Sequence, residues 1–318
     1  MGACDGKHFD GHFDPREKKE KKKEKGGQKK LFCYYSSDAQ YRRDVGKFFP
    51  EDIDPDLCTH IIYAFFQPTD DGRDVRSVEW NDEGPNGLYA RTVALKQKNP
   101  SLRVLLAIGG WVIGSEPFLP IIRTDDNIRT FSKNVVAYLR KHKMDGMDMD
   151  WEFPGVRGST EADKSRFTLL MKTLQEEFTS EAARTGREKL ILTMATAAGS
   201  YYILSGYEPQ ELVKYPDYLL LMTYNYHGSW ENVTGHHSAI WPSDLDRGSR
   251  RELSMQWTVD YWLSVGARRD QIILGLATYG MTFTLADPNQ HDVLAPAIRG
   301  GGRRQKYTNE RGIMAYYE

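Results

Sequence analysis

Three acidic residues, Asp148, Asp150 and Glu152, alternate with large apolar residues in one short stretch of the chain. In an extended strand, successive side chains point to opposite faces, so the acids share one face while Met149 and Trp151 lie on the other. Burying a charged, unpaired carboxylate costs several kcal/mol, so a purely structural strand would not hide three of them. The pattern predicts a strand with its apolar face against helices and its acidic face lining a cavity where carboxylates do chemistry.

The same spacing predicts a general acid. Neighbouring carboxylates on this face lie about 6.6 Å apart, close enough to disturb one another's titration. Asp148 and Asp150 should therefore raise the proton affinity of Glu152 toward neutral pH. The alternatives are a solvated acidic strand end and a calcium loop, although the stretch lacks the spacing, the central Gly and the distal Glu of such a loop.

Composition excludes some classes of protein. The 318 residues carry a formal net charge of −1, which argues against a nucleic-acid-binding protein, and their number suits one large domain or two smaller ones. No apolar run is long enough to span a bilayer. Residues 1–30 have no signal-peptide core and are rich in Lys and Glu, which indicates a charged, disordered linker. A nuclear-targeting or nucleic-acid patch is the weaker interpretation, because Glu interrupts the basic run.

The cysteines leave two possibilities open. Cys33 and Cys58 both lie in or beside strand-like segments, where they could pair in an oxidising compartment or remain buried free thiols, and Cys4 is left over. Asn232-Val233-Thr234 is a sequon for N-glycosylation, a weak signal by itself.

Strand-like and helical segments alternate along the chain. This pattern predicts a parallel α/β fold, and polar and Gly-rich residues at the strand ends favour a (β/α)8 TIM-type barrel. A doubly wound sheet is the alternative, but it wants a glycine-rich phosphate loop after the first strand, which residues 34–39 do not form. The expected strands are residues 31–35, 57–66, 102–110, the acidic stretch, 189–196, 218–224 and 271–278. The expected helices include residues 86–98, one capped by Asp126, one capped by Thr160 and stopped by Gly186, and one from Ser254 to Gly266.

The chain changes character after Tyr279. Residues 286–302 are rich in Pro, Gly and polar residues, and residues 312–317 indicate one short strand. No eighth barrel strand precedes Glu318, so we expect an incomplete barrel and interpret the sequence as truncated. The expected organisation is a linker over residues 1–30, a barrel over 31–280, and the beginning of a small α+β insertion domain over 281–318.

The segment Asp145–Glu152 resembles the active-site signature of glycoside hydrolase family 18, the chitinases and chitinase-like lectins. The resemblance runs from about Leu31 to the end of the chain, closest to animal chitinases. Further matching segments, in the family's order, are residues 33–35, 57–65, 105–111, 222–224, 227–230 and 278–280.

The resemblance implies retaining hydrolysis of chitin in which the substrate's own acetamido group replaces the carboxylate nucleophile. Glu152 would protonate the departing glycosidic oxygen and then activate water. Asp150 would orient the acetamido group, Asp148 would share a proton or hydrogen bond with Asp150, and Tyr224 would donate its hydroxyl to the acetamido oxygen. A chitin-binding lectin is the alternative, although family lectins usually lose the acid at the position of Glu152.

The resemblance also implies a binding site for N-acetylglucosamine oligosaccharides. Exposed aromatic rings can stack on the apolar faces of sugars, although Phe65 is as well explained as barrel core. His227 is a possible groove residue, while His236 and His237 are expected in a loop without metal-ligand spacing. The expected substrate-binding residues are Tyr34, Phe65, Trp111, Met222, Asn225 and Trp230, with structural roles for Asp145, Gly109 and Gly110.

Further implications concern the compartment and the partners. In the family, the positions of Cys33 and Cys58 commonly form a disulfide, which implies secretion. We expect a monomer that uses no cofactor or metal and binds neither nucleic acid nor membranes. Two positions depart from the family pattern: Asn225 stands where many members have Asp, and Met281 where many have Arg.

Overall fold

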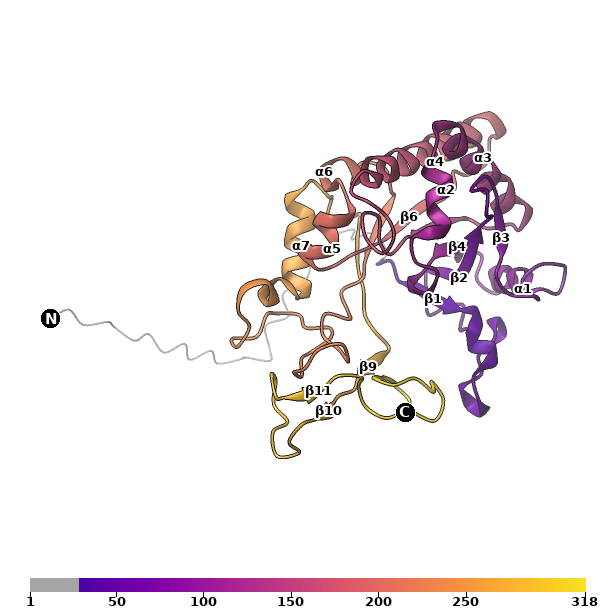
Figure 1. The fold of residues 1–318 in the computed structure, drawn as a ribbon. Helices are drawn as coiled ribbons and strands as arrows, with labels where there is room; N and C mark the ends of the chain where they lie inside the picture. Colours follow the sequence, from indigo (N-terminus) through magenta and orange to yellow (C-terminus); the bar gives the residue numbers. More distant parts are fainter. Residues whose placement is uncertain (1–28) are drawn as a thin grey trace, which may run out of the picture.

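The computed structural model describes residues 29–318, and its centre is a curled parallel sheet with helices on its outer side (Figure 1). Seven parallel strands pair in the order β1-β2-β4-β5-β6-β7-β8, so every strand lies next to its neighbour in the chain. The predicted incomplete (β/α)8 barrel is confirmed. The strands are β1 (Phe32–Ser36), β2 (His60–Pro68), β4 (Arg103–Gly109), β5 (Gly146–Asp150), β6 (Ile191–Thr196), β7 (Tyr218–Leu221) and β8 (Ile272–Leu274), and β3 (Val75–Ser77) pairs antiparallel with β2.

The helices follow the predicted alternation, with differences at two caps. Thr124, not Asp126, caps the long helix α3 by accepting a hydrogen bond from the backbone N–H of Asn127. Thr160 does not cap α4, because its hydroxyl instead donates to the carboxylate of Asp163 at the start of that helix. The helices are α1 (Leu88–Ala94), α2 (Leu119–Ile122), α3 (Asp125–Lys141), α4 (Asp163–Thr185), α5 (Ser200–Gly206), α6 (Pro209–Leu212) and α7 (Met255–Ser264).

Two helix boundaries were predicted correctly. Gly186 ends α4 with a φ of 68°, a left-handed conformation that glycine adopts without a steric penalty. Ser254 caps α7 by accepting a hydrogen bond from the backbone N–H of Trp257.

The sheet separates two apolar clusters. On its outer face, Met147, Met149 and Trp151 are buried, and the Trp151 ring stacks on Phe118 at 4.8 Å and meets Phe167 edge-on at 5.6 Å. This burial confirms that the apolar face of the acidic strand packs outward against helices. The inner face carries a smaller cluster of buried residues: Ile62, Ala64, Leu105, Ala107 and Leu220.

The barrel is open between its first and last strands. Within residues 29–318, β1 and β8 are the two ends of the parallel sheet and do not pair with each other. Apolar side chains are correspondingly exposed at β8, with Leu274 42% and Leu276 72% accessible.

The part of the chain after β8 forms two small antiparallel ladders, drawn in yellow in Figure 1. The strand expected within residues 312–317 is present as β12 (Ile313–Ala315), paired with β9 (Tyr279–Met281). The second ladder joins β10 (Thr284–Leu285) to β11 (Ala297–Ile298). That this part begins an insertion domain stays a prediction.

A disulfide joins Cys33 in β1 to Cys58 just before β2, with Cα atoms 6.2 Å apart, so the pairing implied by the family resemblance is confirmed. Most of the predicted linker, together with Cys4, lies outside the described residues. Among residues 29–318, none of the helices has the length and apolar character needed to cross a membrane.

Candidate active site

Asp148 and Asp150 belong to β5, and the residue directly before this strand, Asp145, is held in place by hydrogen bonds to β4 and to the segment between α1 and β4. The carboxylate of Asp145, directly before β5, accepts hydrogen bonds from Lys96 Nζ at 2.7 Å and from the backbone N–H of Val104 at 2.8 Å. In turn, the backbone N–H of Asp145 donates to the Val104 carbonyl at 2.7 Å. Asp145 thus joins β5 to β4 at the start of the strand, which supports the structural role expected for it.

Asp148 is fully buried and held by two hydroxyl groups. The Tyr34 hydroxyl donates to Asp148 Oδ2 at 2.7 Å, and Thr193 Oγ1 donates to Oδ1 at 2.6 Å. Burial raises the pKa of Asp148 to about 6, while these two hydrogen bonds act in the opposite direction. Sequence reasoning missed Thr193, although it stands directly opposite Asp148 in the parallel pairing of β5 with β6.

Asp150 is buried with one oxygen unused. Within residues 29–318, its Oδ1 has no hydrogen-bond partner. Burial, followed by the charges of Glu152 and Asp148, raises the pKa of Asp150 well above its ordinary value. The raised pKa favours the neutral form of this carboxyl group, and its unused oxygen is available to a ligand.

Two glycines let the end of β4 approach β5 closely. The Gly110 N–H donates to the Asp150 carbonyl at 2.8 Å. Gly109 has a φ of 117°, and a Cβ on it would overlap that same carbonyl. Gly110 has a φ of 85°, and a Cβ on it would come within 2.8 Å of the Phe65 ring. The predicted structural glycines therefore make room for the Asp150 backbone and for Phe65, whose ring packs against the inner apolar cluster.

Glu152 lies two residues beyond the end of β5 and is partly exposed. Burial raises its pKa to about 7, while Arg157 and a hydrogen bond from the backbone of Trp111 oppose the rise. The expected value near neutrality is thus obtained, but the expected cause differs. Burial is the largest cause of the raised pKa at both groups, and repulsion between carboxylates adds to it at Asp150 but is not among the causes at Glu152.

Tyr224 approaches the carboxylates from the end of β7. Burial raises the pKa of its hydroxyl, and the charge of Asp150 is the next contribution. A Cβ at Gly275 would come within 2.8 Å of the Tyr224 ring, so this glycine makes room for the tyrosine. Met222 is only partly buried, packs against the outer core, and donates its N–H to the Thr196 carbonyl at 3.0 Å.

Asn225 is exposed and engaged by a residue that sequence reasoning missed. The Tyr279 hydroxyl donates to Asn225 Oδ1 at 2.7 Å, across a separation of 54 residues. Burial raises the pKa of Tyr279, and the charge of Glu152 contributes to the rise, so the partner of Asn225 lies within electrostatic range of the candidate acid. Met281, the second departure from the family pattern, is paired within β9 with Ile313.

The aromatic candidates differ in their surroundings. Tyr34 is 42% accessible although its hydroxyl reaches the buried Asp148. Trp111 is 52% accessible, and one face of its ring is covered by the Arg157 guanidinium at 3.7 Å. Arg157 also donates to the Glu152 carbonyl at 2.7 Å. Sequence reasoning missed this residue, which joins a candidate sugar platform to the candidate acid.

The expectation that His227, in the segment after Tyr224, is a groove residue was wrong. His227 is buried and its Nδ1 lies 2.9 Å from Glu231, which also pairs with Arg250 at 2.7 Å. His227 therefore holds the segment together and is not exposed in a groove. Trp230 in the same segment is 51% accessible, and its ring covers Gly228 so closely that a Cβ there would overlap it.

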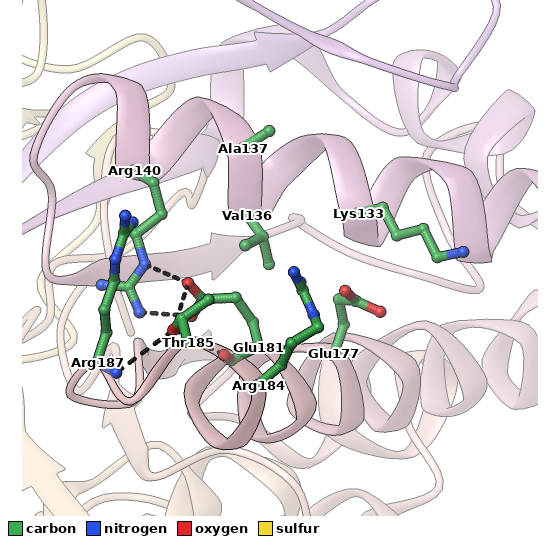
Figure 2. A pocket seen from close by; sticks show the side chains of 9 residues that line it. All are labelled: Lys133, Val136, Ala137, Arg140, Glu177, Glu181, Arg184, Thr185 and Arg187. Atoms are coloured by element: carbon green, nitrogen blue, oxygen red, sulfur yellow. Dashed lines mark hydrogen bonds and ion pairs between the residues drawn. The ribbon is translucent and has the colours of Figure 1, made fainter.

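A separate groove of about 560 Å³ lies between α3 and α4 (Figure 2). At its floor the Arg140 guanidinium binds the Glu181 carboxylate at 2.5 Å and 3.1 Å, which holds the pKa of Glu181 below its ordinary value. A carboxylate kept ionised in this way is a poor general acid, so the groove does not compete with β5 as a catalytic site.

Comparison with known proteins identifies the family to which the chain belongs. The family model for Glycosyl hydrolases family 18 matches residues 30–318. Chitotriosidase-1 from Mus musculus is 41% identical over 293 residues, which cover 92% of this chain and 62% of the mouse protein. The chain therefore spans less than two thirds of that relative's length.

Two solved structures share the fold. An immunomodulatory active chitinase from Trichuris suis superposes with a TM-score of 0.85 at 34% identity, over 91% of this chain and 76% of its own. A human pseudo-chitinase with retained chitooligosaccharide binding superposes with a TM-score of 0.84 at 34% identity, over 91% and 77%. Similar proteins thus include an active enzyme and a protein that binds the oligosaccharide.

Proposed function

Because the chain belongs to glycosyl hydrolase family 18, we propose that it hydrolyses β-1,4-linked N-acetylglucosamine polymers with Glu152 as general acid and base. The observation that carries this proposal is the row of three carboxyl groups on and after β5, with raised pKa values and an unused oxygen on Asp150. Groups poised near neutral pH are suited to donate and then accept a proton.

The proposed reaction is substrate-assisted and retains the anomeric configuration. Glu152, with its pKa of about 7, protonates the glycosidic oxygen while the acetamido carbonyl oxygen attacks the anomeric carbon. Asp150 accepts the acetamido N–H on its unused Oδ1, and the Tyr224 hydroxyl donates to the acetamido oxygen. Glu152 then removes a proton from the water that opens the cyclic intermediate.

Asp148 has a supporting role in this proposal. Tyr34 and Thr193 occupy both of its oxygens, so it stays fixed beside Asp150 instead of contacting substrate. The charge of Asp148 favours the protonated form of Asp150. The site therefore carries less negative charge before the reaction, and Asp150 can ionise when the acetamido group becomes cationic.

Substrate is proposed to lie across the partly exposed Tyr34, Trp111 and Trp230, whose rings offer stacking surfaces for sugars. Phe65, Met222 and Asn225 complete the proposed binding residues, with no cofactor needed for the chemistry. The disulfide Cys33–Cys58 supports an extracellular location, since disulfides persist in oxidising compartments.

The decisive test is Glu152→Gln, assayed for turnover of a fluorogenic chitobioside and for binding of chitin oligosaccharides. We expect turnover to fall by about 10²–10⁴-fold while binding is retained, because Gln keeps the shape of the side chain but cannot transfer the proton. Glu161→Gln, on an exposed side chain away from β5, is the matched control and should leave turnover unchanged. Undiminished turnover in Glu152→Gln would remove Glu152 from its role.

A second candidate function is oligosaccharide binding without hydrolysis. The similarity to a human pseudo-chitinase that retains such binding favours it, as does Asn225 at a position where many active members have Asp. The unsubstituted protein separates the two functions, because binding without turnover between pH 4 and 8 would support the second one.

A further inference from the structure

The sequon Asn232-Val233-Thr234 lies at an exposed place that neither the proposed chemistry nor the core uses. Asn232 is exposed, and its side chain makes no hydrogen bond within the described residues. It is the single Asn-X-Ser/Thr sequon of the chain, because the only similar sequence, Asn99-Pro100-Ser101, has proline at its middle position. Because the Asn232 side-chain amide is exposed and takes part in no hydrogen bond among residues 29–318, it can carry a bulky, hydrophilic group without disturbing the fold.

Backbone hydrogen bonds hold the sequon in one conformation, and this conformation determines the direction of the Asn232 side chain. The Asn232 carbonyl accepts from the N–H of Ala297 at 2.8 Å, and the Thr234 N–H donates to the Ala295 carbonyl at 2.9 Å. Val233 bridges to Pro296 between them. A single antiparallel bridge and its two flanking hydrogen bonds thus hold the segment beside residues 294–297, next to β11. Val233 and Thr234 are partly buried against that neighbour, while Asn232 faces solvent.

The disulfide of the chain indicates passage through the compartment in which asparagine-linked sugars are attached. The disulfide Cys33–Cys58 forms in an oxidising environment such as the lumen of the secretory pathway, where asparagine-linked sugars are attached. Sequon, exposure and disulfide are three separate observations that agree.

From these observations we infer that Asn232 carries an N-linked oligosaccharide. The donor is an oligosaccharide bound to a lipid diphosphate. Asn232 Nδ2 forms a bond to the anomeric carbon of the first sugar, and the bond from that carbon to the phosphate oxygen breaks. The electron pair of the broken bond leaves with the lipid diphosphate, and a general base takes the amide proton, so no oxidant or reductant is needed.

The oligosaccharide sits two residues from Trp230, whose ring is half exposed. Trp230 lies in a turn that is closed by the Glu231 N–H, which donates to the Gly228 carbonyl at 3.0 Å, and Asn232 directly follows this turn. The attached sugar is therefore close in sequence to a half-exposed aromatic ring, at the end of the turn that carries it.

The test is peptide mass spectrometry of the full chain secreted from animal cells, before and after treatment with a peptide N-glycosidase, an amidase that releases the oligosaccharide and converts the glycosylated Asn to Asp. We expect Asp at position 232 after treatment and unmodified Asn at position 99. Asn232→Gln should remove the sugar and the gel shift. Thr234→Ser should retain both, since serine keeps the sequon and the hydroxyl that donates to the Asp292 carbonyl at 2.6 Å.

Unmodified Asn232 in secreted, disulfide-bonded protein would overturn the inference. A gel shift that persists in Asn232→Gln would overturn it as well, because the sugar would then be attached elsewhere. The Asn232 side chain holds no hydrogen bond within the described residues, so folding of Asn232→Gln, monitored by the intact disulfide, is not expected to change.

Discussion

At the scale of single residues, the site depends on how each carboxyl group is kept protonated. Burial holds the pKa of Glu152 at about 7, far above the value of an exposed glutamate. A general acid must carry its proton, so activity is expected to be retained below pH 7 and to fall as the pH rises through about 7. The alkaline limb of a pH–kcat/KM profile reports this ionisation.

Asn225→Asp is expected to move that limb to higher pH. A new negative charge beside Tyr279 adds to the repulsion on ionised Glu152, so the pKa of Glu152 rises. Asn309→Asp is a matched control, because Asn309 is exposed and shares a positive φ, 53° against 56° for Asn225, but lies in the part of the chain after β11. An alkaline limb that stays in place, or moves equally in both variants, would contradict this account.

Some features of the site could be predicted from the local sequence, whereas others depend on contacts that only the fold creates. The alternation of acids and apolar residues in β5 predicted the buried carboxylates and the packing of Trp151, because both follow from the geometry of one strand. Thr193 and Tyr34 contact Asp148 from other strands, so they depend on register. The Tyr279–Asn225 hydrogen bond depends on the path of a long segment after β7, for which no periodic pattern exists.

At the scale of elements, β5 is positioned by its pairing with β4 and by the Asp145 anchor. Asp145→Ala leaves the backbone N–H of Val104 without its side-chain acceptor and breaks the pair with Lys96. We expect the free energy of unfolding to fall by about 1–3 kcal/mol, as measured by urea denaturation.

Asp145→Asn is the informative companion. Asn retains an oxygen for the Val104 N–H but loses the charge that attracts Lys96, so it should be less destabilising than Ala. Equal losses in both variants would assign the whole effect to the ion pair, and no loss in either would show that Asp145 does not anchor the strand.

Element boundaries were predicted less well than element types. Six barrel strands were expected from their apolar runs and β5 from its alternation of acids with apolar residues. Several expected ranges extend beyond the observed strands, as at β7, which ends at Leu221 and not at residue 224. Met222 and Tyr224 follow the strand, and a propensity argument does not distinguish the last paired residue from the first residue of the loop. The cap of α3 was misplaced because Thr124 and two aspartates are adjacent, and each is a competent capping residue.

At the scale of the whole molecule, the unpaired edges at β1 and β8 affect solution behaviour. An apolar edge strand is a template for pairing with another chain, which opposes the expectation of a monomer. Leu276→Lys, on a side chain that is 72% accessible, should reduce concentration-dependent self-association in light scattering. Val45→Lys, 82% accessible in the segment after β1, is the control that should have less effect. Equal association in all three proteins would show that the edge is not the contact.

The order of the strands also places the catalytic candidates. β5 is the fourth of seven parallel strands, with three on either side. Opening that begins at either edge reaches β5 last, so amide hydrogen exchange should be slowest in β4, β5 and β6 and faster in β1 and β8. Tyr34, however, belongs to β1, and Tyr279 follows β8, so each edge contributes a hydroxyl to the site. Fluctuations at the edges would therefore disturb the protonation of the carboxyl groups while the strand that carries them is still protected, and activity should be lost on warming before β5 exchanges.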